Sequence, residues 1–431
     1  MPIELPSTAL LTDHYELTMV AAALRSGAAE ARCVFEVFAR HLPIRRRYGV
    51  VAGTGRLLDA IERFRFGPDE LDDLQAHRVI DPGTAEWLAG YRFAGDVDGH
   101  AEGEVFFPDT PVLTVTGTFA ECVLLETLVL SVLNHDSAVA SAAARMVGAA
   151  GARPVIEMGS RRTHELAAVA AARAAHLAGF ASTSNLEAGR RYGVPTAGTA
   201  AHAFVLAHPS EREAFEAQVA CLGAGTTLLV DTFDVAAGVR TAMSVAGSGL
   251  GAVRIDSGDL AALAFEVRAE LDALGAFLTR IVVTGDLDEY AIATLSGAPV
   301  DSYGVGTSLV TGSGAPTAGF IYKIVERDGV PVEKTSVGKE TRGGRKSPAR
   351  RYEGGTATAD VIRVGSGIAD RGGRAGNERM LHVPLMRAGV RTGDWSLAEA
   401  REHCRASLAE LPREAMKLSA GPPALPTLFE S

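Results

Sequence analysis

Residues 251–260 read GAVRIDSGDL, a short apolar run that ends in charged residues and leads into a stretch with helical spacing. This order is typical of a βα unit, in which a buried strand ends in polar residues and is followed by a helix. Arg254 and Asp256 are two residues apart, so on a strand both side chains point to the same face. The stretch therefore predicts a parallel strand whose carboxyl end carries a cation and a carboxylate together.

The same sequence pattern recurs on both sides of this stretch. Six more apolar runs end in a glycine or a polar residue: PVIEMGSR (154–161), GFASTSN (179–185), VPTAGTAAH (194–202), TTLLVDTFD (226–234), TRIVVTGD (279–286) and VDSYGVGTS (300–308). Their spacing is that of parallel strands joined by crossover helices. Seven such units predict a complete or nearly complete βα barrel with its active site at the carboxyl ends of the strands. An open, doubly wound sheet is the structural alternative.

The two ends of the chain have a different pattern of apolar and polar residues. Alternating apolar and polar residues at Cys33–Ala39 and Glu104–Thr116 predict strands of a mixed α/β domain, and short strands return near the C-terminus. We therefore expect a flanking domain built from residues 1–130 together with 320–431. The catalytic, barrel-like domain is expected over residues 131–319.

Composition limits the kind of protein. The chain has 431 residues, of which 47% are apolar and 22% charged, as in ordinary globular proteins. A net charge of −10 with mixed signs argues against a general binder of nucleic acid or membranes, so an anionic substrate needs a local basic site. The N-terminus has no secretory pattern, and the apolar stretch Thr127–Ala144 is interpreted as a buried helix. We expect a cytoplasmic protein with reduced cysteines.

The charged residues of GAVRIDSGDL admit two interpretations. In the functional one, Arg254 holds an anionic ring substituent while Asp256 and Asp259 approach ribose hydroxyls or a metal-bound phosphate. In the structural one, the first two form an ion pair and Asp259 caps the following helix. The residues alone leave both open.

Two later strand ends predict phosphate binding. The segments IVVTGD (281–286) and YGVGTSL (303–309) have glycines that leave backbone N–H groups facing an anion at a helix start. They are the last two strand units, which often supply the phosphate site of a barrel. Arg161 and Arg162 begin another helix, where cations are unfavourable unless an anion lies near. The basic stretch 334–351 is typical of a solvated loop, although such cations also clamp nucleotide phosphates.

His202 lies in the first turn after a strand end, where it could serve as nucleophile, acid/base or anion ligand. A single histidine on an alanine-rich segment is more typical of a packed, hydrogen-bonded side chain. The residues alone favour that structural interpretation, and the same interpretation holds for His164, His176 and His208.

Over nearly its whole length the chain resembles the nicotinate phosphoribosyltransferase family. Eight segments resemble motifs of that family and occur in its order: TDHYELTM (12–19), FEVFARHLPIRRRYGVVAG (35–53), EMGSRR (157–162), GTAAHAF (198–204), RIDSGDL (254–260), VTGD (283–286), GVGTSLVT (304–311) and KTSVGKETRGGRK (334–346). The resemblance implies the α/β fold of a type II phosphoribosyltransferase, an irregular or incomplete βα barrel flanked by a mixed α/β domain built from both chain ends. It also implies a homodimer with a shared active site.

The implied reaction joins nicotinate to 5-phosphoribosyl diphosphate and gives nicotinate mononucleotide and pyrophosphate, with coupled hydrolysis of ATP to ADP and phosphate. This reaction is the salvage entry to NAD. The implied cofactor is Mg²⁺, and ATP is the implied co-substrate. No direct metal ligand is implied.

The resemblance also assigns roles to residues. His202 is implied to be the histidine that ATP phosphorylates, which replaces the structural interpretation above, and Asp256 is implied to be catalytic. The implied nicotinate site consists of Tyr15, Thr199 and Arg254, with Tyr15 reaching the ring across the dimer interface. The implied phosphoribosyl diphosphate site consists of Thr307, Gly306, Asp286, Asp259, Arg161, Lys334 and Lys339.

Three other functions compete with this one. A sibling transferase for nicotinamide or quinolinate would keep the barrel and change the ring pocket, but Thr199 and Arg254 favour a monoacid. An aldolase-like barrel would need a lysine at a strand end, and the seven runs contain none. A non-catalytic nucleotide-binding regulator would tolerate loss of His202 or the carboxylates, and these are present.

Overall fold

Two compact units make up the chain in the computed structural model, which describes residues 6–334, 342–365 and 374–430. The first unit contains Met1–Ala138 with Thr317–Ser431, and the second contains Val139–Pro316. The long helix α6 (Glu126–Ala150) has residues in both, because the division falls within it.

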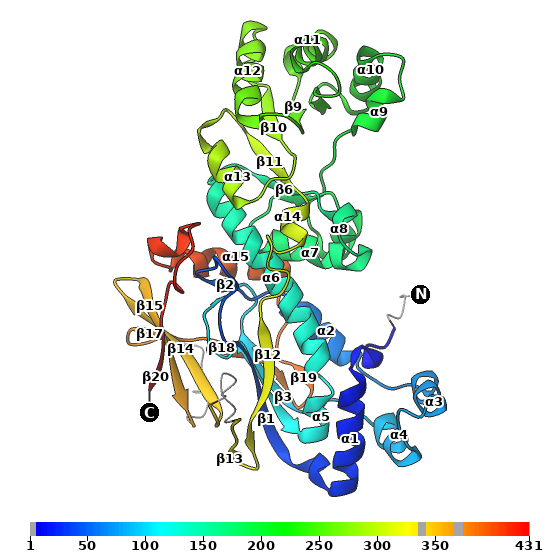
Figure 1. The fold of residues 1–431 in the computed structure, drawn as a ribbon, viewed down its shortest axis with the longest axis vertical. Helices are drawn as coiled ribbons and strands as arrows, with labels where there is room; N and C mark the ends of the chain where they lie inside the picture. The colour runs from blue at the N-terminus through cyan, green and yellow to red at the C-terminus, as the bar shows by residue number, and fades with distance from the viewer. Residues whose placement is uncertain (1–5, 335–341, 366–373, 431) are drawn as a thin grey trace. The chain divides into compact units, whose positions relative to one another are not determined.

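The second unit is built on a parallel sheet of six strands in the order β7-β6-β11-β10-β9-β8. Figure 1 shows β9, β10, β11 and β6 following one another in that order. Their bounds are β6 Val155–Glu157, β7 Ser182–Thr183, β8 Thr227–Leu229, β9 Ala252–Ile255, β10 Arg280–Val283 and β11 Ser302–Val305. Because β11 pairs with β6, the last strand returns to the first, and the sheet is open only between β7 and β8. The sheet is an incomplete βα barrel, as the family resemblance implies, whereas the strand count alone predicts a complete or nearly complete one.

One predicted strand is missing from this sheet. The run VPTAGTAAH (194–202) forms a single bridge between Thr196 and Thr183 rather than a strand among the described residues. Pro195 has no backbone N–H to donate, and glycines at 193 and 198 weaken extended structure. The expected seven strands are therefore six strands and one bridge, which explains why the barrel is incomplete.

Helices follow the strands of the second unit. Most begin at a residue whose side chain accepts a hydrogen bond from a backbone N–H in the first turn, as Asp234 does for α11 and Asp288 for α13. The helices are α7 Glu165–Leu177, α8 Leu186–Tyr192, α9 His202–Leu206, α10 Glu211–Leu222, α11 Val235–Ala246, α12 Leu260–Ala273, α13 Glu289–Thr294 and α14 Thr307–Val310.

Two large sheets and a two-stranded ribbon form the first unit. A seven-stranded antiparallel sheet contains β1 Arg32–Ala39, β3 Asp96–His100, β5 Leu113–Thr118, β12 Phe320–Arg327, β13 Val330–Pro331, β18 His382–Arg387 and β19 Val390–Arg391. Its strands β1 and β12 lie side by side although they are far apart in sequence (Figure 1). The ribbon pairs β2 Gly49–Val50 with β4 Val105–Phe106. Both chain ends thus contribute to one sheet.

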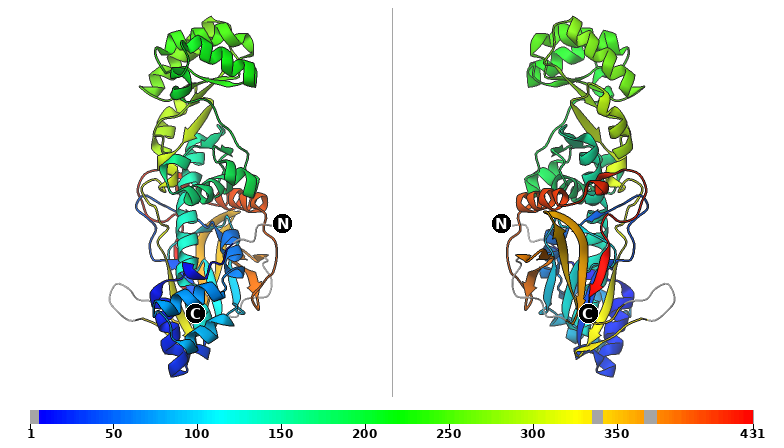
Figure 2. Two further views of the ribbon diagram at one scale, coloured as in Figure 1. Left: turned by 90° about the vertical axis from the view of Figure 1, so that its right-hand side faces the viewer. Right: turned by 90° about the vertical axis from the view of Figure 1, so that its left-hand side faces the viewer.

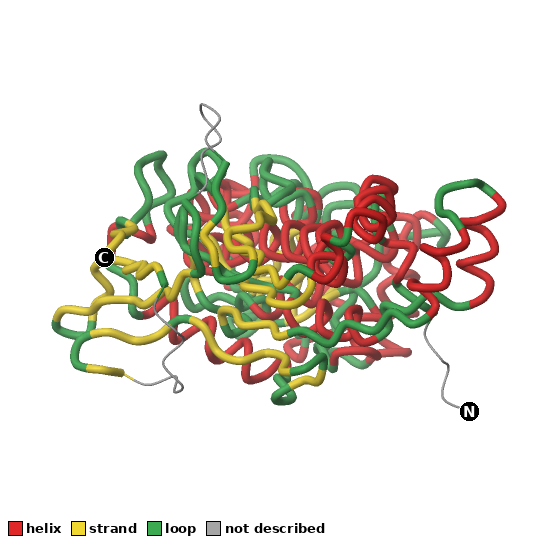
Figure 3. Tube along the Cα trace, turned by 90° about the horizontal axis from the view of Figure 1, so that it is seen from below, coloured by secondary structure: helices red, strands yellow, loops and turns green. Residues whose placement is uncertain are grey.

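The other sheet of the first unit has five strands. These are β14 Lys346–Glu353, β15 Thr356–Val364, β16 Arg374–Ala375, β17 Glu378–Met380 and β20 Thr427–Glu430. The last of them pairs in parallel with β15, so the C-terminal strand ends beside other strands of its sheet (Figures 2 and 3). The helices of this unit are α1 His14–Ser26, α2 Thr54–Glu62, α3 Pro68–Ala76, α4 Pro82–Ala89, α5 Phe119–Val123 and α15 Leu397–Ala409.

The segment Glu104–Thr116 differs from its prediction. It forms two strands, β4 and β5, rather than one continuous alternating strand. Pro108 and Pro111 lie between them, and proline cannot donate to a sheet ladder.

The apolar stretch predicted to be a buried helix lies within α6. The helical region Phe119–Ala150 is long and apolar enough, by length and composition alone, to cross a membrane, but 67% of its most apolar window is buried inside the protein. Leu128, Val129 and Leu133 belong to the main apolar core of the first unit. The region therefore packs as the core helix of a globular protein does.

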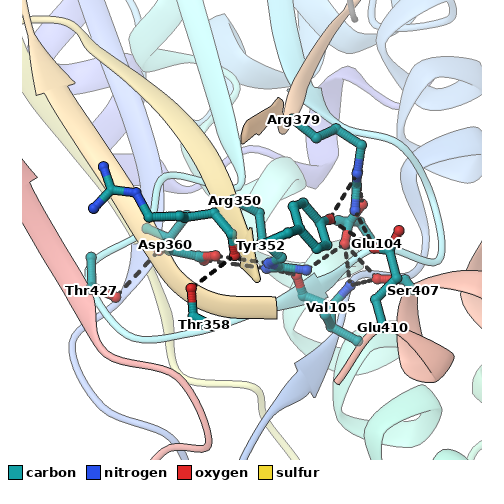
Figure 4. Close-up of polar contacts among 12 residues, drawn as sticks. Glu104, Val105, Arg350, Tyr352, Thr358, Asp360, Arg379, Ser407, Glu410 and Thr427 are labelled. Carbon is teal, nitrogen blue, oxygen red and sulfur yellow. Dashed lines mark hydrogen bonds and ion pairs between the residues drawn. The ribbon is translucent and has the colours of Figure 1, made fainter. Parts of the chain in front are cut away.

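A buried ion network joins the ribbon, the five-stranded sheet and α15 in the first unit (Figure 4). The guanidinium of Arg350 is fully buried between Asp360, at 2.8 Å from Nε to Oδ1, and Glu104, at 2.7 Å from Nη1 to Oε1. Arg379 and His403 also contact Glu104, at 2.7 and 3.0 Å. Burial alone would raise the pKa of Glu104, but the charges of Arg350 and Arg379 and the hydrogen bond from His403 hold it well below its usual value.

Removing one member of this network should be costly. In Arg350→Met the carboxylates of Glu104 and Asp360 lose their shared buried partner, and we expect a loss of about 3–5 kcal/mol in the free energy of unfolding. The neighbouring Arg351 pairs with Glu378 and Glu430 on a more exposed face of the same strand, so Arg351→Met should cost much less. Urea denaturation of both variants measures the difference, and equal losses would contradict the role given to Arg350.

Two buried histidines, His100 and His382, lie together in the first unit. Their ring centroids are 5.6 Å apart. Nε2 of His382 donates to the carbonyl of Pro111 at 2.7 Å, whereas neither ring nitrogen of His100 has a partner among the described residues. Burial lowers the pKa of His382 to about 4 and lowers that of His100 well below its usual value. Both rings are therefore neutral in the folded protein near neutral pH.

These histidines should make folding sensitive to acid. The unfolded chain protonates His382 near pH 6.5 and the folded chain only near pH 4, so the contribution to stability is complete above pH 6.5 and is lost as the pH falls to 4. The loss is of the order of 3 kcal/mol. His382→Gln keeps a donor for Pro111 and should flatten the fall in urea midpoint between pH 6.5 and 4, whereas His77→Gln, at an exposed histidine, should not. Parallel pH profiles for His382→Gln and the wild type would refute this.

Candidate active site

A polar cavity of about 160 Å³ lies at the carboxyl ends of the parallel strands in the second unit. Its lining comes from the ends of β6, β9, β10 and β11 and consists of Met158, Arg161, Arg162, Arg254, Asp256, Thr284, Gly285, Asp286, Gly304, Gly306 and Thr307. Three arginines and two aspartates give this lining a net positive charge. A chain of net charge −10 therefore concentrates cations at one strand-end cavity, which suits an anionic ligand.

Arg254 on β9 lies at the centre of the polar contacts around this cavity. Its side chain is 11% exposed. Nε donates to the hydroxyl of Thr284 at 2.8 Å, and Nη2 donates to Asp256 at 2.8 Å. Nη1 donates to the hydroxyl of Thr199 at 3.0 Å and to the carbonyl of Ala200 at 3.4 Å. Strand spacing places the first two partners beside it, because β9 and β10 are paired at Arg254 and Val282.

Asp256 is ionised and firmly placed. Partial burial opposes its charge, but hydrogen bonds from Thr284 and Arg254 and the charge of Arg254 hold its pKa below the usual value. Its backbone N–H donates to a carboxylate oxygen of Asp231 at 2.8 Å. The strand end thus presents a fixed negative charge directly beside a fixed positive one, which fits both interpretations of the sequence: an ion pair and a ligand site.

A tight turn brings Asp286 to the same cavity. Gly285 has a φ of +110°, and a Cβ there would lie 2.3 Å from the carbonyl oxygen of Asp256. Only glycine fits this approach of one strand end to the next. Asp286 follows with a φ of +45°, an uncommon conformation for a residue with a side chain.

The end of β11 supplies the glycine-rich side of the cavity. The N–H of Met158 donates to the carbonyl of Val305 at 2.8 Å, which holds the turn with Arg161 next to the strand end. Gly306 directly precedes the short helix α14, and Thr307 is its first residue. Arg161 and Arg162 from one turn and Gly306 and Thr307 from the other line the same cavity, and a cationic, glycine-rich lining favours phosphate.

His202 reaches the site through a second carboxylate. Its Nε2 lies 3.1 Å from Oδ1 of Asp231, whose side chain is 1% exposed. The other oxygen of Asp231 accepts from the backbone N–H of Asp256 and from the hydroxyl of Ser257 at 2.9 Å. One buried carboxylate therefore fixes both the histidine ring and the end of β9.

The remaining predicted residues lie elsewhere. Asp259 caps α12 by accepting from the N–H of Ala262 at 3.1 Å, as the structural interpretation expects, and it does not line the cavity. Tyr15, 44% exposed on α1, and Lys334 belong to the first unit, and Lys339 lies outside the described residues. Burial and the charges of Glu126 and Glu16 raise the pKa of Tyr15 to about 12, so its hydroxyl stays protonated.

Two residues of the site escape sequence reasoning. Asp231 follows the buried end of β8, which is the position that Asp256 occupies after β9. This shared strand-end position is the sequence feature that could have identified Asp231. Thr284 directly precedes the glycine of VTGD, but a threonine at a strand end is too common to distinguish without its contacts.

Comparison with known proteins identifies the family. The sequence model of the nicotinate phosphoribosyltransferase (NAPRTase) N-terminal domain matches residues 10–134, and that of the nicotinate phosphoribosyltransferase (NAPRTase) family matches residues 154–339. Nicotinate phosphoribosyltransferase pncB1 of Mycobacterium tuberculosis is 60% identical, over 97% of this chain and 94% of the relative. Nicotinate phosphoribosyltransferase pncB2 of the same organism is 41% identical, over 95% and 89%.

A solved structure agrees with these sequence matches. The crystal structure of human nicotinic acid phosphoribosyltransferase is similar with a TM-score of 0.84 and 26% identity, covering 97% of each chain. The family supplies the reaction class, and the strand-end cavity has the charges that such a reaction requires. On these grounds the chain belongs to the nicotinate phosphoribosyltransferase family.

Proposed function

We propose that the strand-end cavity is where nicotinate meets 5-phosphoribosyl diphosphate, with Arg254 as the ligand of the nicotinate carboxylate. As a member of its family the enzyme forms nicotinate mononucleotide and pyrophosphate, a reaction of NAD salvage. The observation that carries the proposal is the position of Arg254, which holds a fixed cation beside Asp256 at a cavity with net positive charge. A planar guanidinium can donate two parallel hydrogen bonds to a carboxylate, whereas the ammonium group of a lysine is a point charge without this geometry.

The ring-binding side of the site contains Thr199 as well. Its hydroxyl is exposed and contacts Arg254, so it lies where a nicotinate carboxylate would approach. Tyr15 is proposed as a further ring contact, supplied by a second copy of the chain in a homodimer. Its ring is 44% exposed and therefore accessible to such a contact.

The phosphoribosyl side is proposed to consist of Thr307, Gly306, Asp286 and Arg161, which line the same cavity. Displacement at the anomeric carbon develops positive charge on the ribose. A carboxylate near that carbon stabilises it, and Asp256 is the ionised candidate. Lys334, Lys339 and Asp259 are proposed as further phosphate or ribose contacts; of these, Asp259 caps α12, and Lys339 lies outside the described residues.

We propose that Mg²⁺ is held at this site jointly by protein carboxylates and substrate phosphates. No group of three or more His, Cys, Asp or Glu side chains among the described residues could hold a metal ion alone. Mg²⁺ is commonly held by one or two carboxylates together with substrate phosphates. Asp256 and Asp286 are the carboxylates that would hold it, and the ion would neutralise the departing pyrophosphate.

ATP coupling is proposed to pass through His202. Because Nε2–H donates to Asp231, Nδ1 carries the lone pair and is the nucleophilic nitrogen. In the proposed step Nδ1 attacks the γ-phosphorus of ATP, the bond from that phosphorus to the β-phosphate oxygen breaks, and ADP leaves. Water later hydrolyses the phosphohistidine to phosphate. Asp231 also holds the end of β9, so phosphorylation of His202 can bias the neighbouring substrate site.

Substrate choice tests the assignment of Arg254. The purified enzyme with Mg²⁺ and phosphoribosyl diphosphate, with and without ATP, should form a mononucleotide from nicotinate and not from nicotinamide or quinolinate. Arg254→Gln should raise the KM for nicotinate by about ten- to a thousandfold, because a charge-assisted pair is lost. Arg240→Gln, an exposed arginine on α11, should behave as wild type. If mononucleotide formed only from nicotinamide, the proposal would be wrong and the enzyme would be the sibling nicotinamide transferase.

The role of His202 has its own measurement. His202→Ala should abolish incorporation of phosphate from γ-labelled ATP while phosphoribosyl diphosphate still binds. Asp231→Ala should slow labelling at least about tenfold, because the histidine loses the partner that fixes its tautomer. Asp234→Ala, three residues later, removes only the cap of α11 and should label normally with a modest loss of stability. Unchanged labelling of His202→Ala would remove the histidine from this role.

A further inference from the structure

We propose that Thr284 is a positioning residue of the nicotinate site, whose hydroxyl links Arg254 to Asp256 and holds the inner edge of the guanidinium while the outer edge binds the substrate. The proposal rests on the proposed function of Arg254 and extends it. Thr284 is 3% exposed and lies at the end of β10, one residue beyond the strand.

The hydroxyl of Thr284 has one proton and two lone pairs. Its oxygen accepts from Nε of Arg254 at 2.8 Å, and its proton goes to Oδ1 of Asp256. The same carboxylate oxygen also accepts from Nη2 of Arg254. Three side chains from two neighbouring strands therefore form a closed ring of hydrogen bonds, and the hydroxyl is its neutral member.

The packing around Thr284 fixes which way this hydroxyl points. On the next strand, a Cβ added at Gly304 would lie 2.5 Å from Cγ2 of Thr284. The methyl group thus occupies the space that the glycine leaves. The N–H of Thr284 donates to the carbonyl of Ile255 at 2.9 Å, which sets its backbone at the level of Asp256. With methyl and backbone both placed, the hydroxyl is preorganised toward the ion pair.

The bonds of Arg254 divide into inner and outer ones. Four of its five N–H donors are engaged: Nε with Thr284, one on Nη2 with Asp256, and two on Nη1 with Thr199 and Ala200. The hydroxyl of Thr199 is exposed, so a carboxylate can replace it. Thr284 itself is buried, so its bond to Nε remains. A nicotinate carboxylate would then take the Nη1 side without loosening the guanidinium plane.

Thr284→Val tests this arrangement because valine keeps the shape and removes the hydroxyl. It leaves Nε of Arg254 without its acceptor and removes one of the two donors to Oδ1 of Asp256. We expect kcat/KM for nicotinate to fall at least about tenfold, with the KM for nicotinate more affected than that for phosphoribosyl diphosphate.

Matched variants separate the hydroxyl from the packing. Thr284→Ser keeps the hydroxyl without the methyl group and should restore kcat/KM to within about threefold of wild type. Thr294→Val removes an exposed helix hydroxyl that donates only to a backbone carbonyl, and it should behave as wild type. Thermal melting confirms that each variant is folded. If Thr284→Val does not fold, Thr284→Ala takes its place in the comparison with Thr284→Ser.

The outcomes distinguish this proposal from the one on which it rests. Wild-type kinetics in Thr284→Val beside an impaired Arg254→Gln would overturn the role of Thr284 alone. Equal impairment of Thr284→Val and Thr284→Ser would overturn it too, since a hydroxyl at this position would then not be enough to preserve the site. An unchanged KM for nicotinate in Arg254→Gln would remove Arg254 from the site, and the role of Thr284 with it.

Discussion

The cavity around Arg254 and Asp256 depends on a parallel sheet, because only a parallel sheet brings the carboxyl ends of all its strands to one edge. The two residues share a face of β9, and the pairing of β9 with β10 brings Thr284 beside them. The return of β11 to β6 brings the glycine-rich strand end and the turn with Arg161 to the same edge. A change of register by one residue would send these side chains to the opposite face.

The incomplete barrel has a local cause and a useful consequence. Pro195 and its neighbouring glycines reduce one expected strand to a bridge at Thr196, and the sheet stays open between β7 and β8. The segment after that bridge is free of strand geometry, and it carries Thr199 toward Arg254 and His202 toward Asp231. A regular strand would have alternated these side chains across the sheet. The irregular segment instead brings both to contacts with strand-end residues.

Sequence reasoning locates most of the barrel and of its cavity, because buried parallel strands and glycine-ended turns leave local patterns. It fails where the deciding contact is distant in the chain. Asp259 and Asp256 look equally suited to a ligand in RIDSGDL, but one caps a helix and the other lines the cavity. Asp231 and Thr284 have no local signal strong enough to show that they meet His202 and Arg254. Likewise, the two prolines that divide 104–116 are visible, but their effect on pairing depends on the partner strands.

A comparison of two arginines shows how a structural ion pair differs from a functional one. Arg350 and Arg254 each engage several donors with carboxylates and other oxygen acceptors at about the same distances. The partners of Arg350 are as buried as it is, so no ligand can exchange with them, and the pair serves only the fold. Arg254 has the buried Thr284 and the partly buried Asp256 on one edge and the exposed Thr199 on the other. Its geometry is therefore fixed from inside while its outer edge stays exchangeable, and this asymmetry, more than the presence of charge, is what makes a binding site.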